Sequence, residues 1–458
     1  MSYHYWYFLH LALAKTEYMN QKAKGLTLFA LTMIAIGSTI GSGIFKTPSD
    51  IAAAVPNPTE MIGLWVLGGV ISLIGALVFA ELGARFPQSG GLYTYLNKSF
   101  GPIPAFLYGW SLMTVISSGT IAALILVFAD YMQYFISYSD EMKPVVAGFS
   151  IVILTLFNAF GIKSSAWFAN ISTILKIVGI YGLLILALFL GDRAIFGDTT
   201  AAVVADLATK DGGPNYAAAF VGVLWSFTGW HYASFVSGDA INPKRNVPLA
   251  MIIGTTVVTL TYVLCNMGYL AVLDVTTIQN SSTLAADALE KVIPHSGGFV
   301  AALIAISVFG CAGLYILSTP RIINQMASEG LFFKTFAKRS ERFGVPVNAI
   351  ILQSVWSIIL IFLWGRFEAL YTYVTTTEWL FLMIACIGIF VVRYKQKDEK
   401  PSFKTPLYPI LPIIFIGVVA WFIYMNAISD NPSAYFGLLI IPIGLIFYFF
   451  YKKFGRKV

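Results

Sequence analysis

Charged residues are scarce in this chain. Asp, Glu, Lys and Arg make up 11% of its 458 residues, whereas about a quarter of the residues in a soluble domain are charged. Hydrophobic residues reach 58%, and the mean hydropathy is +0.77. Because so few charges cannot cover a water-facing surface, the composition excludes an assembly of ordinary soluble domains.

Cysteine and histidine are also rare, with three and four residues. Cys265, Cys311 and Cys386 all lie in apolar stretches, so we expect no disulfide-linked accessory subunit. The chain has no G-x-x-x-x-G-K-[ST] phosphate loop and no H-E-x-x-H motif. A membrane-embedded enzyme would need a nucleophile with its base, and only isolated candidates occur. We therefore expect no metal, no other cofactor and no enzyme activity.

Long apolar runs are abundant instead. Residues 61–80 carry no charge, and residues 251–273 form a second such run. A helix needs about 20 apolar residues to cross a bilayer, whereas strands of a membrane barrel would alternate in polarity. We predict an all-α multi-pass membrane protein. Its twelve predicted transmembrane helices are centred near residues 35, 71, 117, 153, 181, 226, 262, 311, 356, 382, 417 and 442.

The positive charges are distributed unevenly. If the N-terminus is cytoplasmic, most of the 29 Lys and Arg fall on the cytoplasmic side, with dense clusters in residues 334–342 and 393–404. This pattern predicts that both termini are cytoplasmic and that the protein lies in a plasma or inner membrane. The net charge of +7 then orients the protein in the bilayer and requires no nucleic-acid partner.

Two of the predicted helices contain helix-breaking sequences. Residues 37–43 hold three glycines, and residues 225–231 read Trp-Ser-Phe-Thr-Gly-Trp-His. Glycine in a helix interior costs about 1 kcal/mol relative to alanine, so we predict that helices 1 and 6 are discontinuous. Paired breaks five helices apart are typical of a transporter site built from two repeats. The alternative is that these small residues allow close helix packing.

A broken helix offers unpaired peptide groups to a ligand. The amides of residues 41–43 could bind a carboxylate, helped by the helix dipole. The carbonyls of Ser38 and Thr39, with those near residues 225–226, could accept hydrogen bonds from an ammonium group. An amino acid presents both groups. The predicted substrate-binding residues are Ser38, Thr39, Gly41, Ser42, Gly43, Trp225, Ser226 and Thr228.

Three stretches resemble the amino acid–polyamine–organocation superfamily. Residues 37–45 are similar to its first-helix motif, and residues 80–96 to its second-helix end and following loop. Residues 227–248, with Phe-Thr-Gly-Trp and then Asn-Pro-Lys-Arg-Asn-Val-Pro, resemble in particular the L-type amino acid transporters.

The resemblance implies amino acid transport by a five-plus-five inverted-repeat fold. Residues 25–395 would form the ten-helix transport core, after a cytoplasmic tail of residues 1–24. Residues 396–458 would add helices 11 and 12 and a basic cytoplasmic C-terminus.

Departures from the family pattern bear on the substrate. Trp225 stands where a smaller gate residue is common, and Thr228 where glycine or an acidic residue is frequent. Both would narrow the pocket and favour small neutral L-amino acids such as alanine or serine. The helices expected to line the cavity carry no mid-span carboxylate, which a cationic substrate would need. Proton-coupled symport, and transport of larger neutral or cationic amino acids or polyamines, remain the alternatives.

Lys176 is a positive charge inside a predicted span. Ionisable residues there are functional candidates, although a shallow lysine can extend to the interface. Lys176 resembles a lysine found in some members of the family. The ammonium of that lysine lies where sodium-coupled relatives bind a sodium ion. The resemblance implies sodium-independent exchange or facilitated transport, with Lys176 bridging helices 1 and 8.

We expect the other ionisable residues near the spans to have ordinary structural roles. We expect Glu81 and Arg85, four residues apart, to form an ion pair at a helix end. We expect Glu378 to be protonated or hydrogen-bonded in a structural role, with proton gating as the alternative. His231 should be a packed, neutral histidine rather than a pH sensor.

Overall fold

The structure is a computed structural model of the whole chain, and every element it describes is a helix or a short turn. The predicted N-terminal tail of residues 1–24 falls outside the described part. The described residues are 25–159, 173–182, 184–185, 189, 213–429 and 432–454.

Ten helices within the described residues are long and apolar enough to cross a membrane. Each contains one of the predicted span centres. The other two centres, near residues 181 and 226, lie in a shorter helix, Thr173–Gly182, and in the interrupted segment of residues 216–239. The ten spans are Leu28–Ala54, Pro58–Arg85, Pro102–Met132, Asp140–Ala159, Pro243–Val272, Gly297–Ser328, Val347–Trp364, Phe367–Lys395, Ile410–Ala427 and Tyr435–Lys453.

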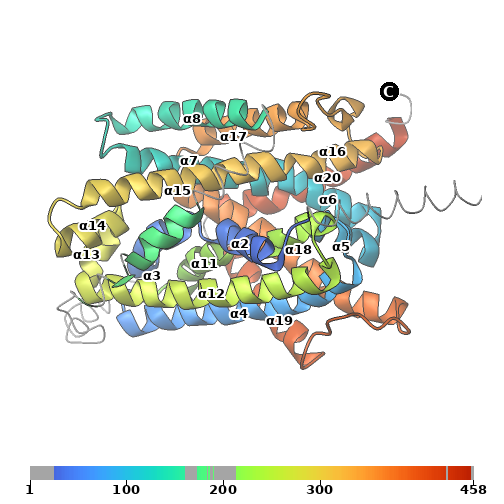
Figure 1. Cartoon of the computed structure of the whole chain (residues 1–458), viewed down its shortest axis with the longest axis horizontal. Coiled ribbons are helices and arrows are strands. Elements are labelled where there is room, and N and C mark those ends of the chain that lie inside the picture. The colour runs from blue at the N-terminus through green and yellow to red at the C-terminus, as the bar shows by residue number, and fades with distance from the viewer. Residues whose placement is uncertain are drawn as a thin grey trace, which may run out of the picture.

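The broken helices occupy the middle of the bundle (Figure 1). There, α2 and α3 lie between two sets of long helices, with α12 and α4 on one side and α15 and α7 on the other. Along its length α12 packs against both α4 and α2, while α11 packs against α3. These central elements are α2 (Leu28–Thr39), α3 (Gly43–Ala54), α4 (Pro58–Arg85), α7 (Ser117–Met132), α11 (Tyr216–Phe227), α12 (Pro243–Val272) and α15 (Gly297–Ser318).

Shorter helices mark the two ends of the bundle. In Figure 1, α13 and α14 lie at one end, and α5 and α16 at the other. The remaining helices pack around the central set. The end helices and the surrounding helices together are α5 (Gly91–Phe100), α6 (Pro102–Ser111), the π-helix η1 (Leu112–Ile116), η2 (Asp140–Met142), α8 (Lys143–Ala159), η3 (Trp230–Asp239), α13 (Val275–Asn280), α14 (Leu284–Val292), α16 (Pro320–Ser328), η4 (Lys334–Ala337), α17 (Val347–Trp364), α18 (Phe367–Lys395), α19 (Ile410–Ala427) and α20 (Pro432–Phe454).

Local sequence explains where several helices begin. The Thr27 hydroxyl accepts from the amide of Ala30 at the start of α2. Asn57 caps α4 in the same way, ahead of Pro58 in the first turn. Proline lacks the N–H that would stay unpaired at this position, and its fixed φ suits the first turn. These caps set the boundaries that the apolar runs alone left open.

Burial identifies the centre of the bundle. In the apolar window of Pro102–Met132, 94% of the residues are buried within the protein, against 17% for Tyr435–Lys453. The peripheral spans expose large side chains such as Leu363 and Ile446, which suits a lipid-facing surface because lipid does not penalise exposed apolar groups. The third span therefore belongs to the core, and the last span lies at the edge.

Candidate functional site

The first span is broken between α2 and α3. The α2 helix ends at Thr39 and α3 begins at Gly43, and we call residues 40–42 the first break. The amides of Ser42, Gly43 and Ile44 have no hydrogen-bond acceptor among the described residues. They lie at the N-terminus of α3, where the helix dipole adds positive potential. This arrangement can bind an anionic group.

Side chains of the protein already pair several carbonyls at the first break. The Lys176 ammonium donates to the carbonyls of Gly37 and Ile40, at 3.1 and 2.7 Å. The Tyr262 hydroxyl donates to the carbonyl of Thr39 at 2.9 Å. The Thr39 carbonyl also accepts from the amide of Gly41 at 2.9 Å, so its role as an acceptor for a substrate ammonium stays a prediction. Nothing in the described residues donates to the carbonyl of Ser38.

The second break separates α11 from η3. The α11 helix ends at Phe227, Thr228 is extended, and Gly229 has φ 130°, a backbone conformation that favours glycine. We call residues 228–229 the second break. The Thr228 hydroxyl donates to the carbonyl of Leu224 and accepts from the indole N–H of Trp379, at 2.8 and 3.0 Å. Trp379 on α18 thus supports the second break.

The segments around the two breaks contact each other through two glycines. A Cβ atom on Gly43 would lie 2.6 Å from the Cα of Ser226, and one on Gly229 would lie 2.5 Å from the carbonyl oxygen of Ser38. At both glycines the backbone of one segment therefore approaches the backbone of the other too closely for any side chain. The Ser226 hydroxyl also lies 2.8 Å from that of Thr47 on α3, which joins the two segments further.

A small cavity of about 20 Å³ lies between the breaks. Such a volume holds about one water molecule, so an amino acid can enter only if the walls move. Seven of the eight predicted substrate-binding residues line it; Ser226 does not and packs against α3 instead. The lining residues are Ser38, Thr39, Gly41, Ser42, Gly43, Thr120, Leu124, Trp225, Thr228, Cys311 and Tyr315.

Four of these lining residues were not predicted individually. Thr120 and Leu124 belong to α7, and Cys311 and Tyr315 to α15. In the sequence, only the small residues at 117–119 and 310–313 indicated that these two helices have room for a substrate. They do not show which face of each helix is turned towards the cavity. No Asp, Glu, Lys or Arg lines the cavity, so its described walls carry no charged side chain.

Lys176 lies in the helix Thr173–Gly182 and is 2% exposed. Its ammonium is directed into the protein, which excludes extension to the membrane interface. The Cys311 thiol on α15 lies 3.9 Å from the Gly37 carbonyl that Lys176 also contacts. Lys176 and α15 thus meet at the same peptide of α2, beside the cavity.

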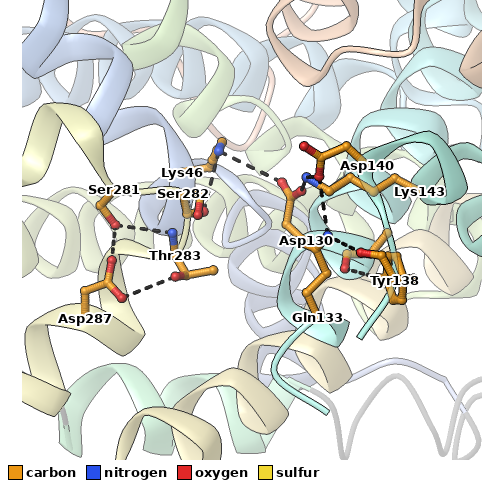
Figure 2. Close-up of polar contacts among 11 residues, drawn as sticks. Lys46, Asp130, Gln133, Tyr138, Asp140, Lys143, Ser281, Ser282, Thr283 and Asp287 are labelled. Carbon is orange, nitrogen blue, oxygen red and sulfur yellow. Dashed lines mark hydrogen bonds and ion pairs between the residues drawn. The ribbon is translucent and has the colours of Figure 1, made fainter. Parts of the chain in front are cut away.

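One end of the bundle is held by a small set of side chains (Figure 2). We call it the Lys46 end, because the Lys46 ammonium on α3 lies 3.9 Å from a carboxylate oxygen of Asp130 on α7. It also donates, at 3.5 Å, to the carbonyl of Ser282 beside α14. Asp130 has a second and closer partner, Lys143 at 2.9 Å. Long contacts from one lysine therefore connect α3 with both neighbours.

The other end is tied by a dense network around Glu81, and we call it the Glu81 end. Glu81 on α4 is fully buried and accepts hydrogen bonds from Arg85, from Arg393 on α18 and from the amide of Thr405. The expected ion pair of Glu81 and Arg85 is present at 3.0 Å, within a larger network that the sequence did not reveal. The guanidinium of Arg393 also stacks on Tyr408, 3.6 Å from the ring centre.

A buried acid and histidine meet beside the second break. The Nε2 atom of His231 on η3 lies 3.3 Å from an Oε1 atom of Glu378 on α18, and both side chains are at most 1% exposed. Neither carboxylate oxygen has an aligned hydrogen bond to any described residue. The hydrogen bonds expected for Glu378 are therefore absent among the described residues.

Comparison with known proteins identifies the family of the chain. A family model described as amino acid permease matches residues 26–448. The chain is 31% identical to the b(0,+)-type amino acid transporter 1 of Mus musculus, over 94% of this chain and 89% of that protein. It is 30% identical to the serine/threonine exchanger SteT of Bacillus subtilis, over 93% and 96%. It is 27% identical to the human cystine/glutamate transporter, over 95% and 87%.

These matches span almost the whole chain and include the helices that carry both breaks. The relatives are transporters and exchangers rather than enzymes. The chain is accordingly a multi-pass membrane transporter that belongs to the amino acid permease family, in the L-type branch of the amino acid–polyamine–organocation superfamily.

Proposed function

We propose that this protein is a sodium-independent exchanger or facilitator of small neutral L-amino acids that works by alternating access. The observation that carries the proposal is the cavity between the two breaks, where the amides of Ser42, Gly43 and Ile44 remain unpaired. A substrate carboxylate at these amides would receive charge-assisted hydrogen bonds. The carbonyl of Ser38 is the acceptor left for the substrate ammonium.

The proposed topology has twelve spans, with residues 25–395 as a five-plus-five inverted-repeat core and residues 396–458 as two added helices. The ten long spans support it, together with the helix Thr173–Gly182 and the α11–η3 segment. We place the Lys46 end outside and the Glu81 end in the cytoplasm, with both termini cytoplasmic in a plasma or inner membrane. All three cysteines are buried, which supports transport without a disulfide-linked subunit.

Lys176 supports sodium independence. Its ammonium occupies the carbonyls of Gly37 and Ile40, which are the kind of oxygen ligands that a sodium ion would need. A fixed positive charge there replaces the ion and would repel it. The Lys176 side chain then stabilises the first break, and transport needs no bound sodium ion at this position.

The cavity walls support a small zwitterionic substrate. A cationic side chain would need a carboxylate partner, and the described lining has none. Trp225 limits the space: it lies near the aromatic rings of Phe367 and Tyr371, with centroids 6.0 Å apart in both cases. These rings can support Trp225 as the wall that excludes large side chains.

Counterflow in proteoliposomes tests the proposal. Vesicles loaded with unlabelled alanine should take up labelled alanine faster than empty vesicles, equally well in sodium and in choline medium. Serine should compete, and leucine and phenylalanine should compete weakly. A sodium requirement would remove the role given to Lys176, and strong competition by leucine without competition by alanine would reject the substrate class.

A lysine variant tests the mechanism within the same assay. Lys176→Met removes the ammonium, so that the Ile40 carbonyl loses the Lys176 donor and the Gly37 carbonyl keeps only the long contact with the Cys311 thiol; an unpaired buried carbonyl costs about 1–3 kcal/mol. We expect exchange to fall at least tenfold. Lys291→Met is the matched control, because Lys291 is exposed on α14. Unchanged exchange in Lys176→Met would show that the first break does not depend on this contact.

A further inference from the structure

We propose that His231 and Glu378 form a proton-binding site that must hold one proton whenever the carrier is closed. The inference rests on the proposed alternating-access cycle and adds a ligand to it, a proton at a named pair of atoms. Nε2 of His231 and Oε1 of Glu378 are 3.3 Å apart, with exposed fractions of 0% and 1%.

The net charge of the buried pair is the reason to infer a bound proton. With a neutral imidazole and an ionised carboxylate the pair carries one negative charge, and a buried charge without a partner is strongly disfavoured. With one added proton the pair is neutral overall, whether the proton lies on the carboxyl oxygen or on the imidazole. The closed protein therefore favours the pair with its proton bound.

The surroundings offer no other charge that could balance the carboxylate. Among the described residues, neither side chain forms an ion pair with a lysine or arginine, and their four polar atoms lack aligned hydrogen bonds. The titratable groups that face the pair are tyrosines: Tyr232 of η3, Tyr108 of α6, Tyr315 of α15 and, beyond Phe79 of α4, Tyr95 of α5. Tyrosines are neutral near pH 7.

The pair is connected to the transport site on both sides. His231 follows the second break by two residues, and Glu378 precedes Trp379, whose indole N–H donates to the cavity residue Thr228. Tyr315 lines the cavity and also faces Glu378. When the second break rearranges to admit substrate, His231 moves relative to Glu378, and the pair can exchange its proton with water.

The proton then sets the rate of transport and not its direction. Loaded and empty carriers both pass through a closed state, so both need the proton on the pair, and no net proton movement accompanies amino acid exchange. A carrier whose pair lacks the proton closes rarely. Exchange should fall about tenfold per pH unit on the alkaline limb, because one proton is involved.

Exchange at equal pH inside and outside tests this proposal. Glu378→Gln keeps the shape of the side chain but is neutral without a proton, so its alkaline limb should disappear while exchange at acidic pH persists. Glu399→Gln is the matched control, because Glu399 is exposed and its variant should keep the wild-type profile. A Glu378→Gln carrier that retains the wild-type alkaline limb would overturn the proposal.

Two further measurements keep the test decisive. If Glu378→Gln is not recovered as folded protein, the double variant His231→Asn/Glu378→Gln supplies a neutral amide pair and should also be independent of pH; an alkaline limb in this variant would overturn the proposal. Failure of the proposed function is distinguishable, because it would appear as no alanine exchange at any pH. If alanine is not exchanged, the pH dependence of exchange is measured with an amino acid that the carrier does exchange.

Discussion

The two ends of the bundle are closed in different ways. At the Lys46 end, one ammonium reaches Asp130 at 3.9 Å and the Ser282 carbonyl at 3.5 Å, and both charged side chains are partly exposed. At the Glu81 end, a fully buried carboxylate receives two guanidinium groups and a backbone amide. Exposed ion pairs contribute about 0–1 kcal/mol, whereas breaking a buried one costs about 3–5 kcal/mol. The Lys46 end should therefore open more readily.

The largest effect is expected from the buried carboxylate. Glu81→Gln leaves Arg85 and Arg393 without their shared partner, and we expect a loss of about 3–5 kcal/mol in the stability of the closed Glu81 end. The measurement is the thermal stability of the purified protein in detergent, together with proteolysis at residues 396–405. Glu341→Gln, at an exposed position, is the control. A variant as stable as the control would show that the two ends are closed equally weakly.

An intermediate effect is expected from a second contact at the Glu81 end. The Tyr93 hydroxyl on α5 donates to Glu329 beyond α16 at 2.6 Å. Burial, followed by the neighbouring Glu329 carboxylate, raises the pKa of Tyr93 above its usual range, so the hydroxyl remains a donor at neutral and mildly alkaline pH. Tyr93→Phe should destabilise the protein by about 1.5–3 kcal/mol.

The pH dependence of this contact gives its own check. Because the raised pKa keeps Tyr93 protonated, the stability difference between wild type and Tyr93→Phe should stay constant from pH 7 to pH 9. A difference that shrinks across this range would show that the hydroxyl loses its proton there and that the contact is weaker than its geometry indicates.

The smallest effect is expected at the Lys46 end. Lys46→Met removes the link from α3 to Asp130 and Ser282, which is worth at most about 1 kcal/mol. Opening of this end should become up to about fivefold more frequent. The native Cys311 thiol in the cavity wall reports the opening, as the rate of its modification by a membrane-impermeant thiol reagent. Lys291→Met supplies the control, and a loss of thermal stability larger than that of Glu81→Gln would reverse the comparison.

The all-helical architecture and its long spans were predictable from the sequence, and the site only in part. Apolar runs indicated the spans because their length must match the bilayer, and the glycine clusters at 37–43 and 225–231 located both breaks. The face that each helix turns towards the cavity could not be predicted, because the lipid-facing and protein-facing sides of a span are both apolar. For that reason Ser226 was placed in the cavity although it contacts Thr47, and Tyr315 was missed.

Contacts between distant helices escaped prediction for a related reason. Which carbonyls a broken helix leaves free depends on donors from other helices, and Tyr262 takes the carbonyl of Thr39. His231 and Glu378 each looked like an ordinary packed residue, since nothing in either local sequence shows that α18 faces η3. Such pairs become visible only when the helices are assembled.

The close approach of the two breaks constrains how this chain can diverge. Gly43 lies against Ser226, and Gly229 against Ser38, at separations where no Cβ fits. A mutation that enlarged either glycine would require a compensating backbone shift in the opposite segment. Lineages that descend from such a carrier should therefore vary freely along their lipid-facing helices, while both positions stay glycine.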